Sequence, residues 1–351
     1  MIIAHNDPPR ARKINYRHDG EASMNFWILA IFVAGVLGYA IASYIFCVCL
    51  NFKLHDGYKD EDIVYPRRRP DGVTDDAFLI DMHAHTNVSD GLLDPGQLVA
   101  WSISNGYDGL VVTDHNTMEG VDALQAAAAR AGRPFVVIPG VEFTSLRVHM
   151  NLIGVRTPMP RPNLLWPTKQ SIKAAIDHAH AEGGVVQLNH PGWYPYRIFK
   201  SLPREWWLAQ GIDGWEVYNG FGFTDEDALG FIKQHENERV MFASGGTDVH
   251  DPAKHHRMYT EVLTTDRSVE GVITALKAGK TRAITSAGTT QDRDRPERGK
   301  IAHNPERLAC IKRWAWLDWI GLSLMSGTHV RYVKAFLVVV IALGIVLSLV
   351  F

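Results

Sequence analysis

The chain has 351 residues, a formal net charge of −2 and 46% hydrophobic residues. This length is enough for one large or two ordinary folded domains, each with a buried core. A net charge near zero excludes a broadly basic surface, so we expect no binding to a nucleic acid duplex. Three cysteines are too few for a disulfide framework. Nothing in the composition indicates a protein partner.

Two long apolar segments flank the polar middle of the sequence. Residues 24–50 follow a polar tail of residues 1–23, and residues 335–351 form the second segment. A helix needs about 20 residues to cross a hydrocarbon layer, so we expect a transmembrane helix at 24–50 and a shorter one at 335–351. A cleaved signal peptide is the alternative for the first segment. Its apolar run exceeds the usual length of about 7–15 residues, and no small-x-small cleavage site follows it.

Basic residues predict how the chain is oriented in the lipid bilayer. They are more frequent on the inner sides of the two apolar segments than in the tail: Lys53, Lys59, Arg67, Arg68, Arg69, Arg331 and Lys334. The positive-inside rule therefore favours a membrane protein whose central domain is cytoplasmic. Residues 51–76 and 286–313 are rich in charge, proline and glycine, and we expect linkers there. The tryptophans of residues 314–334 are typical of an interfacial segment.

Between residues 77 and 285, strand-like and helix-like segments alternate. The expected strands are 78–82, 109–113, 135–138, 148–155, 185–189, 214–218, 240–244 and 260–264. The expected helices are 95–105, 118–131, 171–182, 225–238 and 268–278. Pro95 and Ser268 are suitable helix starts, and Gly106, Gly132, Gly183 and Gly279 suitable stops. This alternation predicts an α/β domain with a parallel sheet, either open or closed into a barrel.

A His-x-His motif follows the first of these strands. His83 and His85 are two residues apart, so both side chains leave an extended chain on the same side and can reach one metal ion. Asp90 lies on the following loop and offers a hard oxygen ligand. Many such histidine pairs are ordinary polar strand ends, so the motif needs support from the rest of the chain.

That support comes from the other strand ends, where further histidines and carboxylates occur. In an α/β barrel, the carboxyl ends of the strands form one face, and sites are built there. We therefore expect nine side chains to converge on one metal centre: His83, His85, Asp90, His115, Glu142, His149, His190, Asp248 and His250. Nine nitrogen and oxygen ligands without a thiolate suit two or three divalent ions such as Mn, Zn or Fe.

Each residue alone has an ordinary alternative. His149 could be a core histidine, and Asp114 could cap a helix. His178 and His180 lie within a predicted helix, where a solvated face is the simpler interpretation. His255 and His256 could line the site or belong to a surface loop. Aromatic and basic residues after His190 could contact a substrate, although an apolar rim is equally consistent: Trp193, Tyr194, Tyr196 and Arg197.

Taken in order, these motifs resemble the PHP (polymerase and histidinol phosphatase) superfamily. The resemblance is carried by His83-x-His85, Ser89-Asp90-Gly91, Thr113-Asp114-His115, Glu142, His149, Asn189-His190-Pro191 and Asp248-x-His250, and covers residues 78 to 285. It implies a distorted seven-stranded (βα) barrel with a trinuclear site. In detail, the segment Trp215–Gly220, which includes Asn219 as a candidate substrate contact, is similar to the carbaryl-hydrolase-like branch.

The resemblance also implies how the ligands divide among three metals. His83, His85, Glu142 and Asp248 would hold the first metal. Glu142 would bridge to the second, which His149 and His190 would complete. Asp90, His115 and His250 would hold the third. Glu142 and Asp248 would thereby take part in catalysis. Independently of the resemblance, Asp114 lies next to a ligand, and we expect it to contribute to catalysis by orienting the site rather than as a base.

Three functions fit these residues. Clustered divalent ions lower the pKa of bridging water, so the first is a phosphoesterase in which hydroxide attacks the phosphorus of a small ester. The second is a hydrolase of carboxylic or carbamic esters or amides on the same site. The third is a membrane module that binds metal without catalysis. The complete ligand set favours an enzyme, and we expect a phosphoesterase.

Overall fold

The computed structural model describes residues 34, 35, 38, 58–145, 148–159, 167–191, 202–252 and 255–286. The strands are β1 (Leu79–Ala84), β2 (Gly109–Val112), β3 (Val136–Ile138), β4 (Gly140–Thr144), β5 (His149–Ile153), β6 (Val185–Leu188), β7 (Gly214–Asn219), β8 (Phe242–Gly246), β9 (Met258–Val262) and β10 (Thr281–Thr285). The helices are α2 (Asp60–Ile63), α3 (Pro95–Ser104), α4 (Val121–Ala129), α5 (Lys169–Ala181), α7 (Arg204–Gln210), α8 (Asp227–Gln234) and α9 (Val269–Lys277). The expected α/β class is confirmed.

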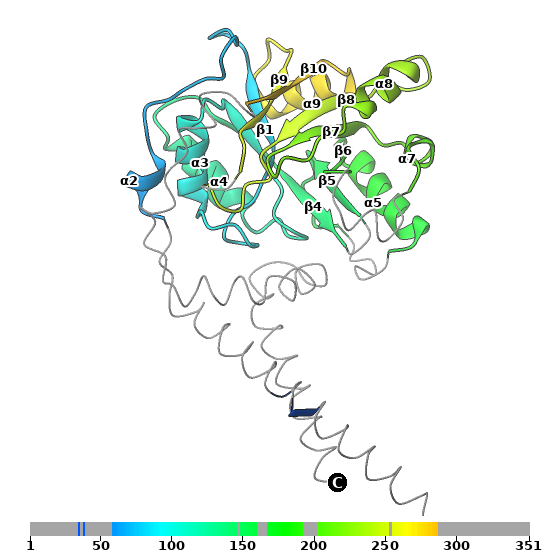
Figure 1. The fold of residues 1–351 in the computed structure, drawn as a ribbon, viewed down its shortest axis with the longest axis horizontal. Coiled ribbons are helices and arrows are strands. Elements are labelled where there is room, and N and C mark those ends of the chain that lie inside the picture. The colour runs from blue at the N-terminus through cyan, green and yellow to red at the C-terminus, as the bar shows by residue number, and fades with distance from the viewer. Residues whose placement is uncertain are drawn as a thin grey trace, which may run out of the picture. The chain divides into compact units, whose positions relative to one another are not determined.

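The strands form two five-stranded sheets, in the orders β10-β9-β1-β2-β3 and β4-β5-β6-β7-β8 (Figure 1). Single bridges join β1 to the segment after β8, at Ala84 and Val249, and join the segment after β2 to β4, at His115 and Glu142. Because only Pro139 separates β3 from β4, the two act as one bent strand. The bridges link the two sheets, and a closed seven-stranded barrel stays a prediction.

The strand directions differ from the parallel sheet that the sequence predicted. β1, β2 and β3 are parallel, as are β6, β7 and β8. β5, however, is antiparallel to both β4 and β6, and β9 is antiparallel to both β1 and β10. The expectation of a parallel sheet is therefore wrong for these pairs. Only four residues connect β4 to β5, which is too few for a parallel crossover.

Local sequence signals account for the helix ends. The Asp94 side chain accepts a hydrogen bond from the Gln97 amide and Gln97 reciprocates, so α3 begins with a capping box followed by Pro95. Ser268 caps α9 by accepting from the Gly271 amide. Figure 1 shows α3 and α4 outside the sheet that contains β1, and α5 and α7 beside the other sheet.

Residues 58–76, which the sequence predicted to be linker, pack against the domain instead. Ile63 is completely buried in a cluster with Leu98 and Trp101 of α3. Two arginines of the same segment bind Asp108, Arg67 at 2.6 Å and Arg69 at 3.1 Å. The expected linker is therefore wrong for this part, which we call the N-terminal strap (residues 58–76).

Several sequence predictions fall almost entirely outside the described residues. They are the polar tail at 1–23, the membrane helices at 24–50 and 335–351, the linker at 286–313 and the interfacial segment at 314–334. Within the described part of the chain, no helix combines the length and the apolar character needed to span a bilayer. The membrane helices and the cytoplasmic orientation stay predictions.

Candidate metal centre

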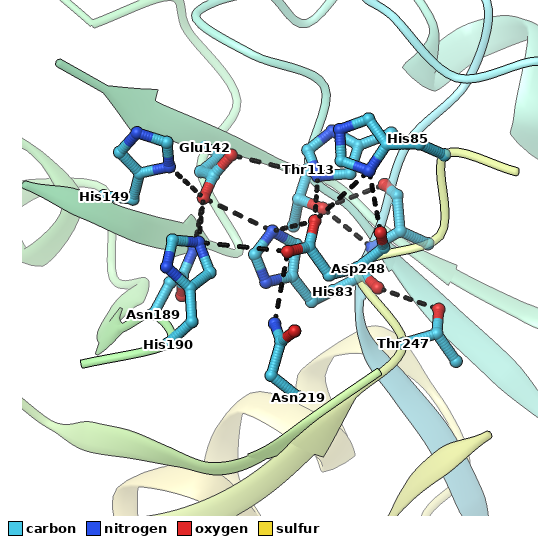
Figure 2. Close-up of polar contacts among 12 residues, drawn as sticks. His83, His85, Thr113, Glu142, His149, Asn189, His190, Asn219, Thr247 and Asp248 are labelled. Atoms are coloured by element: carbon cyan, nitrogen blue, oxygen red, sulfur yellow. Dashed lines mark hydrogen bonds and ion pairs between the residues drawn. The ribbon is translucent and has the colours of Figure 1, made fainter. Parts of the chain in front are cut away.

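All nine residues that the sequence singled out as metal ligands meet at one place in the structure. They form four overlapping groups, and within each group the candidate ligand atoms lie within 4.8 Å of one another. The groups are His85, Asp90, His115 and His250; His83, His85 and Asp248; His83, Glu142 and His190; and His115, Glu142 and His149. Each side chain comes from a strand or from the loop that follows it (Figure 2).

Glu142, on β4, is the centre of this arrangement. Its carboxylate lies 2.6 Å from His115 Nδ1, 3.2 Å from His149 Nδ1, 3.3 Å from His83 Nε2 and 3.5 Å from His190 Nε2. Figure 2 shows His83, His149 and His190 pointing toward the carboxylate from different parts of the fold. A fully buried carboxylate surrounded by four imidazoles is well placed to bridge two cations.

Asp248 forms a second meeting point, directly after β8. Its Oδ1 lies 3.0 Å from His85 Nε2 and 3.4 Å from His83 Nε2. Asn219 donates from Nδ2 to Oδ2 at 3.2 Å. Asp248 has a positive φ of 53°, a conformation that costs energy outside glycine and that clusters at functional sites. The backbone is thus held so that the carboxylate turns into the site.

Asp90 and His250 form the open edge of the centre. Asp90 Oδ2 lies 3.2 Å from His250 Nε2, and Asp90 Oδ1 lies 3.6 Å from His115 Nε2. These two side chains are 28% and 22% exposed, whereas His83 and Glu142 are completely buried. A substrate can therefore approach the centre from the side of Asp90 and His250.

The division of ligands among metals is less sharp than the resemblance implied. His85 belongs both to the group around Asp248 and to the group around Asp90, and His115 contacts Asp90 as well as Glu142. The structure therefore brings all nine residues together but does not separate them into three sets. The assignment of individual ligands to individual metals stays a prediction.

The histidines are oriented as metal ligands are. His83 places Nδ1 3.0 Å from a carboxylate oxygen of Glu216, which fixes the ring. Its Nε2 is buried and, like Nδ1 of His85, has no hydrogen-bond partner among the described residues. A buried nitrogen costs free energy unless it is paired. A cation between the histidines and carboxylates would pair it, so the residues present fit a divalent metal with nitrogen and oxygen ligands.

The electrostatics of the site favour charged carboxylates. Burial alone would raise the pKa of Glu142, but His115, His149 and His83 hold it well below its usual range. Burial likewise opposes ionisation of Asp248, yet His83, His85 and His250 keep its pKa well below the usual value. Both carboxylates are consequently deprotonated at neutral pH, as metal ligands must be.

The sequence analysis missed Glu216, on β7. Its side chain is 1% exposed; Oε1 accepts from His83, and Oε2 accepts from the His190 amide at 2.6 Å and from Asn219 Nδ2 at 3.1 Å. One carboxylate thus orients groups from three strand ends. Its place between Trp215 and Val217, in an otherwise apolar strand, was the signal that could have identified it.

Asp81 is a second buried carboxylate that the sequence analysis did not select. It accepts hydrogen bonds from the amide and hydroxyl of Thr247, at 2.9 and 2.6 Å. Burial raises the pKa of Asp81 to about 7. The contact joins β1 to the segment just before Asp248, and thereby fixes the distance between His83 and Asp248.

Asp114 binds the segment between His85 and Asp90. Its carboxylate accepts from the Thr86 amide at 2.7 Å, from the Thr86 hydroxyl at 2.8 Å and from the Ser89 hydroxyl at 2.8 Å. It belongs to none of the metal-binding groups in the described residues. Asp114 therefore holds the loop that carries Asp90, and its orienting role stays a prediction.

The remaining candidates have four different outcomes. Asn219 lies inside the site, bound to Glu216 and Asp248. Trp193, Tyr194, Tyr196 and Arg197 lie outside the described residues. His255 is only 1% exposed, so the surface-loop alternative is wrong for it, whereas His256 is partly exposed. His180 lies 2.7 Å from Asp213 and is remote from the ligand groups.

Comparison with known families agrees with this geometry. Residues 81–210 match the model of the PHP domain. The match includes seven of the nine ligand candidates, and the segment after it supplies the other two, Asp248 and His250.

Several proteins of known sequence or structure are similar to parts of this chain. The 5′-3′ exoribonuclease Rnm of Salmonella typhimurium is 32% identical over 91 residues, which are 25% of this chain and 31% of that protein. A 3′,5′-nucleoside bisphosphate phosphatase of Chromobacterium violaceum is 28% identical over 108 residues, 31% of this chain and 38% of that protein. This chain thus spans about a third of the length of these curated relatives.

A solved structure from Bacteroides vulgatus, described as a two-domain protein containing a predicted PHP-like metal-dependent phosphoesterase, is 24% identical. The similarity covers 63% of this chain and 68% of that one, with a TM-score of 0.49.

Proposed function

We propose that the chain is a metal-dependent phosphoesterase that acts at the centre around Glu142. The observation that carries this proposal is the convergence of nine nitrogen and oxygen ligands, with Glu142 in contact with four histidines at 2.6 to 3.5 Å. Divalent ions bound there, of the Mn, Zn or Fe type, would lower the pKa of water and stabilise negative charge on a phosphate.

The protein's own residues provide the positioning. Glu216 and Asp81 fix β1 against β7 and the end of β8, so that His83 and Asp248 keep their separation. Asp114 holds the loop of Asp90. Because Asp90 and His250 are the more exposed ligands, the ester enters at their edge, and the buried side around Glu142 remains closed to bulk water.

Charge favours a phosphate ester over an uncharged carboxylic ester. The nine ligands include three carboxylates, Asp90, Glu142 and Asp248, and six histidines that bind metal as neutral imidazoles. Two or three divalent ions carry more positive charge than three carboxylates neutralise. The loaded centre is therefore cationic and attracts an anionic substrate. The curated relatives are named for acting on RNA and on a nucleoside bisphosphate, both of which are phosphate esters.

Two narrower features belong to the same proposal. The motif details around Trp215–Gly220 support a place in the carbaryl-hydrolase-like branch. The apolar segments 24–50 and 335–351 support attachment of the catalytic domain to a membrane, with a small ester as the substrate.

A matched set of esters tests the reaction. The full-length chain is stripped of metal, reloaded with Mn or Zn, and assayed with p-nitrophenyl phosphate, bis-p-nitrophenyl phosphate and p-nitrophenyl acetate, which share one leaving group. We expect metal-dependent release from a phosphate ester and a much smaller rate with acetate. Release from acetate alone would replace the proposal with a carboxylic ester hydrolase. No release from any ester by a fully loaded protein would support the non-catalytic module.

A further inference from the structure

An exposed aromatic ring lies beside the open edge of the metal centre. Phe221 is 51% exposed and is the one aromatic residue among the exposed large hydrophobic side chains of the described residues. Its ring centroid lies 5.8 Å from that of His250 and 4.2 Å from that of His255. A phenyl ring that is exposed to water lacks the favourable free energy of burial. Here the exposed ring lies close to His250, one of the candidate metal ligands.

The loop that carries Phe221 is tightly fixed. The Phe221 amide donates to Asn219 Oδ1 at 2.9 Å, and the Gly220 amide donates to the Gly246 carbonyl at 3.0 Å. A Cβ on Gly220 would lie 2.0 Å from the Thr247 carbonyl oxygen, so only glycine permits this close approach. The loop therefore presents Phe221 in a defined position rather than as a freely moving side chain.

The same loop is bound directly to the metal centre. Asn219, whose Oδ1 holds the Phe221 amide, donates from Nδ2 to Asp248, as Figure 2 shows. On its other side the Phe221 ring meets His255 edge to face, and His255 Nδ1 lies 2.9 Å from the Asp251 carbonyl oxygen. Phe221 thus keeps a fixed relation to Asp248 and His250.

We propose that Phe221 stacks on a planar aromatic group in the alcohol part of the phosphate ester. The inference rests on the proposed function and narrows it to esters that carry an aryl or heteroaryl ring. When the phosphate is held at the centre, its ester oxygen points toward the open edge of the site. Asp90 and His250 are exposed at this edge, and Phe221 lies beside it. A ring there would bury apolar area against Phe221, and aromatic pairs are favourable beyond the area that they bury.

Phosphonates test this binding without any hydrolysis. Phenylphosphonate and methylphosphonate offer the same anionic head to the metals and differ in the ring, and their dissociation constants are measured by calorimetry with the Mn-loaded full-length chain. We expect wild type to bind phenylphosphonate more tightly than methylphosphonate. Phe221→Ala should weaken the binding of phenylphosphonate about tenfold and leave the binding of methylphosphonate unchanged. Phe221→Tyr should keep the preference for phenylphosphonate over methylphosphonate.

A matched control removes an exposed apolar side chain elsewhere. Leu263, which follows β9, is also 51% exposed, and Leu263→Ala should bind both phosphonates like wild type. The role of Phe221 would be overturned if Phe221→Ala lost affinity for both phosphonates equally, or if it kept the wild-type preference for phenylphosphonate. The phosphoesterase proposal would still stand in either case. If neither phosphonate binds to the loaded wild type, both proposals fail together.

Discussion

At the scale of single residues, Glu142 decides whether the centre can hold metal. Its carboxylate contacts His115, His149, His83 and His190, so Glu142→Gln removes the negative charge that these groups share. We expect this variant to lose most bound metal and nearly all hydrolysis, because a weaker ligand lowers metal affinity and raises the pKa of bound water. Elemental analysis and turnover are measured beside circular dichroism, which should stay unchanged.

Asp114→Asn is the matched comparison, since it removes a buried carboxylate that is not a ligand. It weakens the hydrogen bonds to Thr86 and Ser89 and loosens the loop of Asp90. Activity should fall about 10–100-fold while most metal is retained. Full turnover in Glu142→Gln would show that Glu142 is not a bridging ligand, and unfolding of that variant would make the metals structural.

Glu216 allows a sharper test of orientation, because it holds two ligand candidates, His83 and His190, and belongs to none of the metal-binding groups in the described residues. Removing its carboxylate in Glu216→Ala frees the His83 ring and leaves the His190 amide without this acceptor. Metal affinity, measured by competition with a chelator, should fall about 10–100-fold. Glu236, an exposed carboxylate on the segment after α8, provides the control Glu236→Gln, which should bind metal like wild type. Equal metal affinities in the two variants would show that Glu216 does not orient the metal ligands.

At the scale of elements, the N-terminal strap is part of the folded domain. Ile63 is completely buried, whereas its neighbour Val64 is 47% exposed. Ile63→Ala should therefore lower the free energy of unfolding by about 2–5 kcal/mol, and Val64→Ala should change it by no more than about 0.5 kcal/mol. Urea unfolding of the two variants measures the difference. Similar small effects in both would mean that the strap does not contribute to the core.

The apolar segments at 24–50 and 335–351 make a separate prediction. A helix of about 20 apolar residues partitions into lipid, so the protein should remain in the membrane pellet after an alkaline carbonate wash. A variant without residues 1–50 and 335–351 should be released, since it lacks both segments. Recovery of the full-length chain in the supernatant would contradict a transmembrane attachment.

At the scale of the whole molecule, the site was easier to predict than the fold around it. Each ligand follows a short apolar run, and strand ends on one face of a barrel bring distant residues together, so the nine could be named from sequence. The direction of β5 could not be predicted from sequence, because the apolar pattern of a strand carries no information on the direction of its partner. Glu216 was missed because the ligand candidates that it holds, His83 and His190, lie far from it in the sequence.

The strap was mistaken for a linker for a related reason. Its prolines and arginines are typical of linkers, and what holds it is long-range: Tyr65 donates to Asn105 at 2.6 Å, 40 residues away, and Arg257 reaches Tyr65 at 3.2 Å from 192 residues away. The composition of the strap shows its likeness to a linker, but it does not show these long-range contacts. Contacts of this kind are settled by the tertiary structure alone.

The most direct test of the whole account is the amount of metal that the centre holds. The full-length chain is stripped with a chelator, reloaded with Mn or Zn, freed of excess ion and measured by elemental analysis against protein concentration. The convergence of nine ligands in four overlapping groups predicts two to three ions per chain. Fewer than one ion per chain after reloading, in a protein that is folded by circular dichroism, would contradict it.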